Sequence, residues 1–368
     1  MNKKEVAEIR KTLTKENCSI DKVCACYVTP SKDKKIIPVS NFLSLPEEEM
    51  EKYLDIFKKS LGGSIGKQLH ELEFPLDEET KEDSTQKLLY DLKKNGLKDD
   101  SKVEQLFDRI INNYDAKDYY CIIVMHANYD VITKASDDSD LGSDETYSHI
   151  ICSICPTTLS KGGLAYNPGE NVLEDSIKNW MVGNPSFAFL FPTFTDRCSD
   201  IHAVLSFTKK METINTPIIE TVLGCKVPLY NELQIDGFLN ATQAAFENQV
   251  SFEQAIEIQE VIYSKIEENK SNDEPLTLSK NEMKNLLESK DATNLEAFDE
   301  SFEENLSDNS VFVENLVDKK KCVVQTPDVT ITINPLAMNL ISVKEVDGKK
   351  CIVIVPNGDI NVNGINTH

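Results

Sequence analysis

Apolar positions follow two different periods along the chain, and the change between them predicts the fold class. Between residues 44 and 114 they recur at helical spacing, as in Met50, Leu54 and Phe57. From residue 119 they form short runs bounded by Pro, Gly, Asn or Asp, which is typical of strands. No repeated helix separates these runs, so a mixed or antiparallel sheet is expected rather than a doubly wound one. The pattern predicts an α+β domain over residues 1–210, with strands at 120–125, 150–155, 187–194 and 201–207.

The second half of the chain divides into three parts by pattern and charge. Amphipathic helices predict a helical subdomain at 211–268. Residues 269–310 read as an acidic linker that carries a short helix pair, because residues 267–309 hold 13 Asp or Glu against 4 Lys. Residues 311–368 hold 6 acidic and 6 basic residues. Their apolar runs predict a small β unit in which Asp347-Gly348 is a strong two-residue hairpin signal.

Charge and composition then restrict the partners. The formal net charge of −23 opposes binding to nucleic acid or to anionic membrane surfaces. No apolar run reaches the roughly 18 to 20 residues of a spanning helix, and residues 1–10 lack the apolar stretch of a secretory signal. Ten cysteines in such a chain are expected to be reduced thiols. We therefore expect a cytoplasmic protein that binds neither nucleic acid nor membranes and whose partner is another protein, of neutral or cationic surface.

The densest polar constellation is the segment Asp196–His202, between two predicted strands. It contains Asp196, Arg197, Asp200 and His202. Only three of the 39 basic residues are Arg, so a guanidinium flanked by carboxylates stands out against a Lys background. The planar guanidinium binds carboxylate or phosphate in a bidentate way that an ammonium group cannot reproduce. A structural ion pair that fixes the loop is the first interpretation, with Arg197 paired to Asp196, Asp200 or another carboxylate. A catalytic or binding site is the alternative.

Histidines at predicted strand ends add a second hypothesis. His126 ends one strand and His149 begins the next, so either could join His202 across the sheet. The chain lacks a metal-binding signature such as His-Glu-x-x-His, and single histidines at strand ends are usually ordinary structural residues. His126 is kept as a candidate catalytic residue, and no cofactor is predicted.

Two cysteine pairs are weak candidates for a zinc site. Cys24 and Cys26 lie two residues apart on a predicted strand, and Cys152 and Cys155 form a Cys-x-x-Cys pair. Four thiolates can bind tetrahedral zinc, but both pairs stand in apolar, β-rich runs. Buried structural thiols are therefore favoured. A glycine-rich stretch, Gly62–Lys67, resembles a phosphate loop, but it follows a helix rather than a strand, which favours a helix-ending turn over an anion site.

Several segments along the chain share a pattern with a known family: the opening residues 1–10, Phe42–Met50, Ile151–Pro156, Phe189–Pro192, Asp196–His202, Val222–Cys225, Thr326–Val329 and Val362–Ile365. Taken together, these segments resemble the bacterial family catalogued as domain of unknown function 4317, over essentially the whole chain. The family occurs in Gram-positive anaerobic bacteria and implies no activity. Its pattern more often has Ser where this chain has Cys198, which argues against Cys198 as a nucleophile.

Two functions of different class remain. An interaction or regulatory protein without catalysis is favoured by the missing catalytic signatures and by the several units. The alternative is a hydrolase or phosphoryl-handling enzyme that uses the Asp196–His202 segment. A cluster of the histidines with this segment beside a pocket would favour the enzyme, and a continuous exposed patch would favour the interaction protein.

Overall fold

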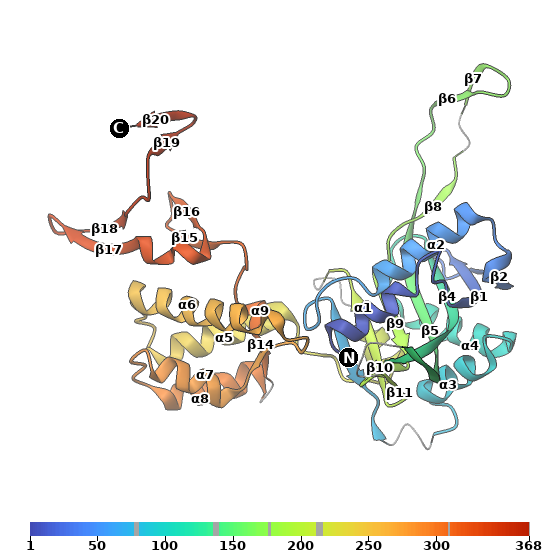
Figure 1. Cartoon of the computed structure of the whole chain (residues 1–368), viewed down its shortest axis with the longest axis horizontal. Helices are drawn as coiled ribbons and strands as arrows, with labels where there is room; N and C mark the ends of the chain where they lie inside the picture. Colours follow the sequence, from blue (N-terminus) through green and yellow to red (C-terminus); the bar gives the residue numbers. More distant parts are fainter. Residues whose placement is uncertain (77–80, 135–139, 176–177, 211–215, 308–309, 368) are drawn as a thin grey trace. The chain divides into compact units, whose positions relative to one another are not determined.

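The computed structural model describes residues 1–76, 81–134, 140–175, 178–210, 216–307 and 310–367. The chain divides into two compact units, Met1–Pro228 and Leu229–His368, as Figure 1 shows by colour. Both helices and strands are well represented, which confirms the predicted α+β class. Among the described residues, no helix is both long and apolar enough to span a membrane.

Unit 1 is built on one antiparallel sheet with the strand order β2-β1-β4-β5-β9-β12-β3. Each of the four predicted apolar runs supplies a strand of this sheet: β4, β5, β9 and β12. Every pairing is antiparallel, which agrees with the absence of crossover helices in the sequence. The strands are β1 (Ile20–Val28), β2 (Lys34–Asn41), β3 (Leu69–Glu73), β4 (Tyr120–Lys134), β5 (Asp140–Leu159), β9 (Phe187–Phe191) and β12 (Ala203–Thr208).

Helices cover both faces of this sheet, so it has two cores. Alternate residues of each strand point to opposite faces: in β4, Ile122 and Val124 pack on one side, and Cys121, Ile123 and Met125 on the other. The first side is covered by α3 (Thr85–Asn95), α4 (Asp100–Asn113) and a π-helical turn at Ile218–Val222. The second side is covered by α1 (Lys3–Lys11), a 3-10 turn (Phe42–Ser44) and α2 (Glu47–Ser60).

Past the sheet, β5 continues into an extended arm, described over residues 157–175 and 178–182, that projects from unit 1 (Figure 1). The base of the arm is a short ladder in which β8 (Trp180–Val182) pairs with Thr157–Leu159. Its tip is a hairpin of β6 (Leu164–Asn167) and β7 (Val172–Asp175). This arm was not predicted from the sequence, because its apolar residues do not form a continuous run.

Unit 2 begins with helices that share one core. They are α5 (Asn231–Ala245), α6 (Phe252–Glu268), α7 (Lys280–Glu288), α8 (Leu295–Leu306) and the short α9 (Val313–Leu316). The predicted helix pair of the acidic segment is present as α7 and α8, but it packs through Leu287, Phe298 and Phe302 into the core of α5 and α6. It is therefore part of the helical unit rather than a tethered linker, because its apolar faces need a partner to bury them. A two-residue ladder joins β13 (Thr277–Leu278) to β14 (Val311–Phe312).

The remainder of unit 2 consists of two-stranded hairpins. They are β15 (Cys322–Gln325) with β16 (Thr330–Ile333), β17 (Ile341–Val346) with β18 (Lys349–Ile354), and β19 (Ile360–Val362) with β20 (Ile365–Thr367). The predicted Asp347-Gly348 hairpin is confirmed, with φ of 51° and 71° at its two turn residues. Positive φ at both positions is what a type I′ turn requires.

Candidate functional site

The Asp196–His202 segment is a tight hairpin rather than an open catalytic loop. Strand β10 (Thr193–Thr195) pairs with β11 (Cys198–Asp200), and Asp196 and Arg197 are the two turn residues between them. Both have positive φ, 53° and 58°, as in a type I′ turn. Left-handed φ is uncommon for residues other than Gly, and the Arg197 side chain also makes contacts outside the hairpin.

Those contacts are with helix α1. Arg197 donates from Nε to Oε2 of Glu8 at 3.2 Å and from Nη2 to Oε1 at 2.9 Å, which is the bidentate geometry expected of a guanidinium. Tyr129 donates its hydroxyl to the same Glu8 carboxylate at 2.8 Å. The hydrogen bonds to Glu8 raise the pKa of Arg197. The predicted structural ion pair is therefore present. In these bonds Arg197 pairs with the distant carboxylate of Glu8, and not with Asp196 or Asp200 beside it in sequence.

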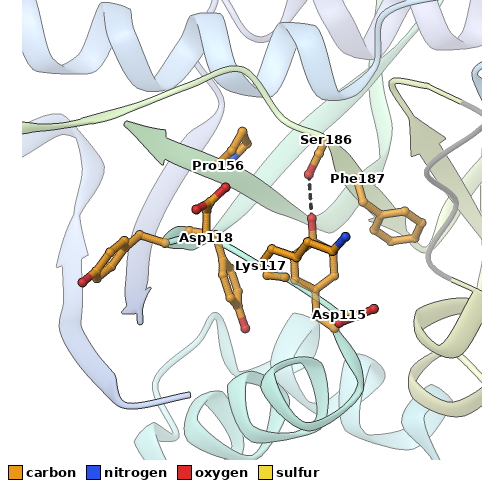
Figure 2. Close-up of a pocket in the computed structure, with 10 residues that line it drawn as sticks. Asp115, Lys117, Asp118, Pro156, Ser186 and Phe187 are labelled. Carbon is orange, nitrogen blue, oxygen red and sulfur yellow. Dashed lines mark hydrogen bonds between the residues drawn. The ribbon is translucent and has the colours of Figure 1, made fainter. Parts of the chain in front are cut away.

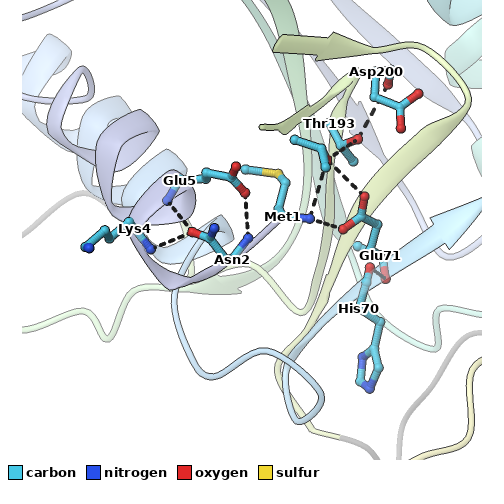
Figure 3. A network of polar contacts seen from close by, with 10 residues as sticks. Met1, Asn2, Lys4, Glu5, His70, Glu71, Thr193 and Asp200 are labelled. Atoms are coloured by element: carbon cyan, nitrogen blue, oxygen red, sulfur yellow. Dashed lines mark hydrogen bonds and ion pairs between the residues drawn. The ribbon is translucent and has the colours of Figure 1, made fainter. Parts of the chain in front are cut away.

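The base of the same hairpin is attached near the start of α1 (Figure 3). The amino group of Met1 is buried against the carboxylate of Glu71 and lies 3.4 Å from Oγ1 of Thr195. Thr195 also donates to Glu71 at 3.2 Å. Asp200 accepts from the backbone N–H of His202 at 2.9 Å, and the side chain of His202 is exposed. Together these contacts hold the Asp196–His202 hairpin against α1, and we call this arrangement the hairpin clamp. His126 does not take part in these contacts.

His126 instead belongs to a polar chain that crosses three strands. Its Nδ1 lies 2.6 Å from Oδ1 of Asp21, and its Nε2 lies 2.9 Å from Oγ of Ser148. The three residues come from β1, β4 and β5. A register shift at Ile20/Lys22 accompanies the placement of Asp21 beside His126, as β-bulges re-aim side chains. An ionised carboxylate only accepts hydrogen bonds, so Nδ1 donates to Asp21, and in the neutral imidazole Nε2 then accepts from Ser148.

This order of groups, carboxylate to imidazole to hydroxyl, is the hydrogen-bond order of a nucleophilic serine. His126 is buried and Ser148 is half-buried, while the Asp21 side chain is 43% exposed. The αL residue Gly96, which ends α3, lies over the imidazole: a Cβ there would be 3.7 Å from Nδ1. Sequence reasoning missed Asp21 and Ser148, because neither stands in a motif and only strand pairing joins them to His126.

The four candidate zinc ligands do not converge. Cys24, Cys26 and Cys152 face the α3–α4 side of the sheet, whereas Cys155 faces the α1–α2 side. Residues three apart in a strand point to opposite faces, so a Cys-x-x-Cys pair within β5 cannot chelate one ion. Burial raises the pKa of Cys24 to about 12 and of Cys26 to about 11, which opposes the thiolate form that zinc needs. Within the described ranges, no three His, Cys, Asp or Glu residues are grouped to hold a metal.

The base of the arm carries an aromatic surface that the sequence analysis did not single out. Trp180, the only tryptophan of the chain, packs on Tyr119 with ring centroids 4.2 Å apart and lies 6.4 Å from Tyr27. Trp180 is 43% exposed and its neighbour Met181 is 56% exposed. The only sequence feature that could have pointed to this surface is that Trp180 is the single Trp of the chain. What the sequence lacked was any indication that this residue lies on a projecting ladder instead of in a core.

A cavity of about 280 Å³ opens beside this surface (Figure 2). The residues arranged around it include the loop Asp115–Asp118 and, from the sheet side, Pro156, Ser186 and Phe187. Ser186 is fixed by Tyr114, whose hydroxyl lies 2.9 Å from Oγ, and by its own donation to the carbonyl of Ile154. The volume is slightly below the roughly 300–1,000 Å³ of small-molecule sites.

Comparison with known proteins agrees with the resemblance seen in the sequence. A search of curated proteins finds no match. A family model described as "Domain of unknown function (DUF4317)" matches residues 1–365. Because this match covers nearly the whole chain, both units lie within it, and so do the hairpin clamp, the Asp21–His126–Ser148 chain and the arm. The protein belongs to the DUF4317 family.

Proposed function

We propose that this chain is a cytoplasmic protein-interaction protein and that the arm of unit 1 carries its binding surface. The observation behind the proposal is a run of large apolar side chains that stay exposed along the arm. Large aromatic and Met residues of this kind supply most of the energy of protein interfaces. The exposed apolar residues of the arm are Leu159, Leu164, Tyr166, Val172, Leu173, Trp180, Met181 and Val182.

Charge supports a basic partner over a second copy of the chain. The tip of the arm exposes Glu170, Glu174 and Asp175, and two copies would each bring a net charge of −23. Like charges oppose association, whereas opposite charges around an apolar centre increase both the rate and the specificity of binding. The partner is therefore a protein with an apolar patch surrounded by Lys or Arg. All ten cysteines are free thiols, which suits a reducing compartment.

Replacing Trp180 and Met181 together by Ser is expected to abolish partner binding while unit 1 stays folded. Both side chains are largely exposed, and the Tyr119–Trp180 contact contributes about 1 kcal/mol. The measurement is quantitative cross-linking and mass spectrometry of the protein isolated from its own cells. Leu43→Ser is the matched control, because Leu43 is 68% exposed but lies outside the arm. Equal recovery of the same partners with both variants would refute the proposal.

A second candidate function, hydrolysis of an ester or amide, is favoured by the Asp21–His126–Ser148 chain. In such a reaction the Ser148 hydroxyl attacks an acyl carbon and its proton passes to Nε2 of His126. That proton then goes to the leaving alcohol or amine, and water releases the acyl group by the same route. Asp21 would hold the imidazole tautomer. This assignment replaces the Asp196–His202 segment as the candidate site for a hydrolase, because Arg197 there is committed to Glu8.

This candidate predicts that a fluorophosphonate probe labels the folded protein on Ser148. Labelling requires a serine that is activated by its base, so it is expected to disappear in Ser148→Ala and to drop at least about 100-fold in rate in His126→Gln. Ser64→Ala removes an exposed serine elsewhere and is expected to change nothing. If the parent protein is not labelled, the hydrolase candidate is refuted and the Asp21–His126–Ser148 chain has a structural role only.

A further inference from the structure

A cavity of about 550 Å³ in unit 1 gathers positive charge in a chain that is otherwise strongly acidic. Four segments distant in sequence form it: the end of α1, the end of α2 with the loop that follows, the residues before β9, and the end of β12. Its cationic residues are Arg10, Lys58, Lys59 and Lys209. With Asp55 as the one acidic residue of the lining, these side chains leave a net charge of +3.

The partial negative charges of the two helix C-termini at this cavity neutralise only part of its net positive charge. Arg10 lies in the last turn of α1, and Lys58 and Lys59 lie in the last turn of α2. Basic residues there complement the helix dipole, and each C-terminus contributes about −0.5 charge. Two such ends offset about one positive charge, so about two remain uncompensated. Lys209 is on neither helix and adds to the same cavity from the end of β12.

The cations of this cavity differ from three other cations of unit 1, which have partners in the structure. Arg197 is bound to Glu8, Arg109 donates to Thr85 and to the carbonyl of Asp83, and Lys34 pairs with Asp108. Within the described part of the chain, no ion pair involves Arg10, Lys58 or Lys209. Lys59 donates to the amide oxygen of Asn184 at 2.9 Å, a neutral acceptor that leaves its charge unmatched.

The uncharged residues that line the cavity indicate what else a ligand would contact. Phe207 and Pro185 give the cavity an apolar wall, and Asn184 provides an amide. Gly62 and Gly63 bring bare backbone to its rim, and Gly63 has φ of 105°. A Cβ on Gly63 would come within 2.7 Å of the Gln68 side chain, so the turn itself requires this glycine. The cations, and not the glycines, therefore carry the inference.

We propose that this cavity binds a small organic molecule carrying two or more phosphate groups. The volume lies within the range of small-molecule sites. Lys and Arg are the usual phosphate-binding side chains, and several of them match a diphosphate better than a single carboxylate. Phe207 and Pro185 would contact the part of the ligand that bears the phosphates. The Gly62–Lys67 stretch, for which the sequence favoured a helix-ending turn over an anion site, contributes to the rim of this site through Gly62 and Gly63.

The test is isothermal titration of the full chain with sodium pyrophosphate and, separately, with inorganic phosphate, in buffer containing EDTA. We expect saturable binding of one pyrophosphate per chain, tighter than that of phosphate. In Lys58→Gln/Lys209→Gln the affinity is expected to fall at least about tenfold, because two charge-assisted contacts are lost. Lys52→Gln/Lys98→Gln removes the same charge at exposed positions outside the cavity and is expected to leave the affinity within about twofold.

Three results would overturn the proposal. One is the absence of saturable pyrophosphate binding by a parent protein shown by circular dichroism to be folded. Another is an equal loss of affinity in both double variants, which would mean that net charge alone attracts the anion. The third is tighter competition by a glutamate-rich peptide than by pyrophosphate, which would assign the cavity to an acidic protein segment. All four replaced lysines are half-buried or exposed, so the variants are expected to fold.

Discussion

The free energy of unfolding of unit 1 is expected to fall by about 5 kcal/mol between pH 7 and pH 4.5 through two buried histidines alone. Burial lowers the pKa of His149 to about 3 and that of His70 to about 4. In the unfolded chain each titrates near 6.5. Below that pH the unfolded state binds more protons than the folded state, so stability is lost as the pH falls, and each histidine contributes about half of the effect.

His149 offers the sharper test of this prediction. Its ring is fully buried and stacks on Tyr147 with centroids 4.6 Å apart, so phenylalanine can replace it with little change in packing. His149→Phe is expected to reduce the loss between pH 7 and pH 4.5 by about 2.5 kcal/mol. Urea unfolding followed by far-ultraviolet circular dichroism at the two pH values measures the difference.

The control for this prediction is His202→Gln, which removes an exposed histidine from the same unit. It is expected to leave the pH dependence as in the parent protein, because the side chain of His202 is exposed and folding does not bury it away from water. If His149→Phe and His202→Gln show the same dependence as the parent, His149 is not the buried neutral group described here.

Replacement of Gly237 by Val in unit 2 is expected to cost about 2 to 3 kcal/mol of stability through overpacking. Gly237 lies within α5, where glycine by itself is unfavourable, but α8 packs directly against it. A Cβ at this position would come within 2.5 Å of Cδ2 and 2.7 Å of Cγ of Leu306, which is fully buried. Urea unfolding, with hydrogen exchange of peptides from α5 and α8 to localise the change, measures the effect.

A double-mutant cycle separates this clash from other effects of the substitution. Leu306→Ala removes the atoms that a Cβ would meet, so Gly237→Val is expected to cost at least about 1 kcal/mol less in that background. Asp236→Val introduces the same side chain on the exposed face of α5 and reports the helix propensity of valine alone. Additive effects of Gly237→Val and Leu306→Ala would contradict direct packing of the two residues.

Sequence reasoning was most successful where structure depends on neighbouring residues. The apolar runs predicted the strands β4, β5, β9 and β12, because side-chain alternation and strand-ending residues act over a few positions. The Asp347-Gly348 turn was predicted for the same reason, since its backbone requirement lies within two residues. The helix pair of the acidic segment was found, yet its packing against α5 and α6 was not. A periodic face shows that a helix needs a partner without saying which one.

The candidate sites depend on contacts between distant segments, and here the sequence was insufficient. The rarity of arginine correctly indicated that Arg197 makes a bidentate ion pair, but its partner Glu8 stands 189 positions away. The Cys-x-x-Cys pair gave a zinc hypothesis that strand geometry does not support, because Cys152 and Cys155 face different cores. The distance between two cysteines in space follows from their spacing in sequence only when the secondary structure between them is known.

The sequence by itself determined the α+β class, the four apolar strands of the main sheet, the acidic helix pair, the Asp347-Gly348 hairpin and the net charge of −23. These follow from local periodicity, turn chemistry and summed charge. Only the tertiary structure decided which polar groups meet. Strand pairing and a β-bulge brought Asp21 and Ser148 to His126, and four separate segments placed Arg10, Lys58, Lys59 and Lys209 around one cavity. Such meetings depend on the register and order of strands far apart in the chain, and no local pattern encodes them.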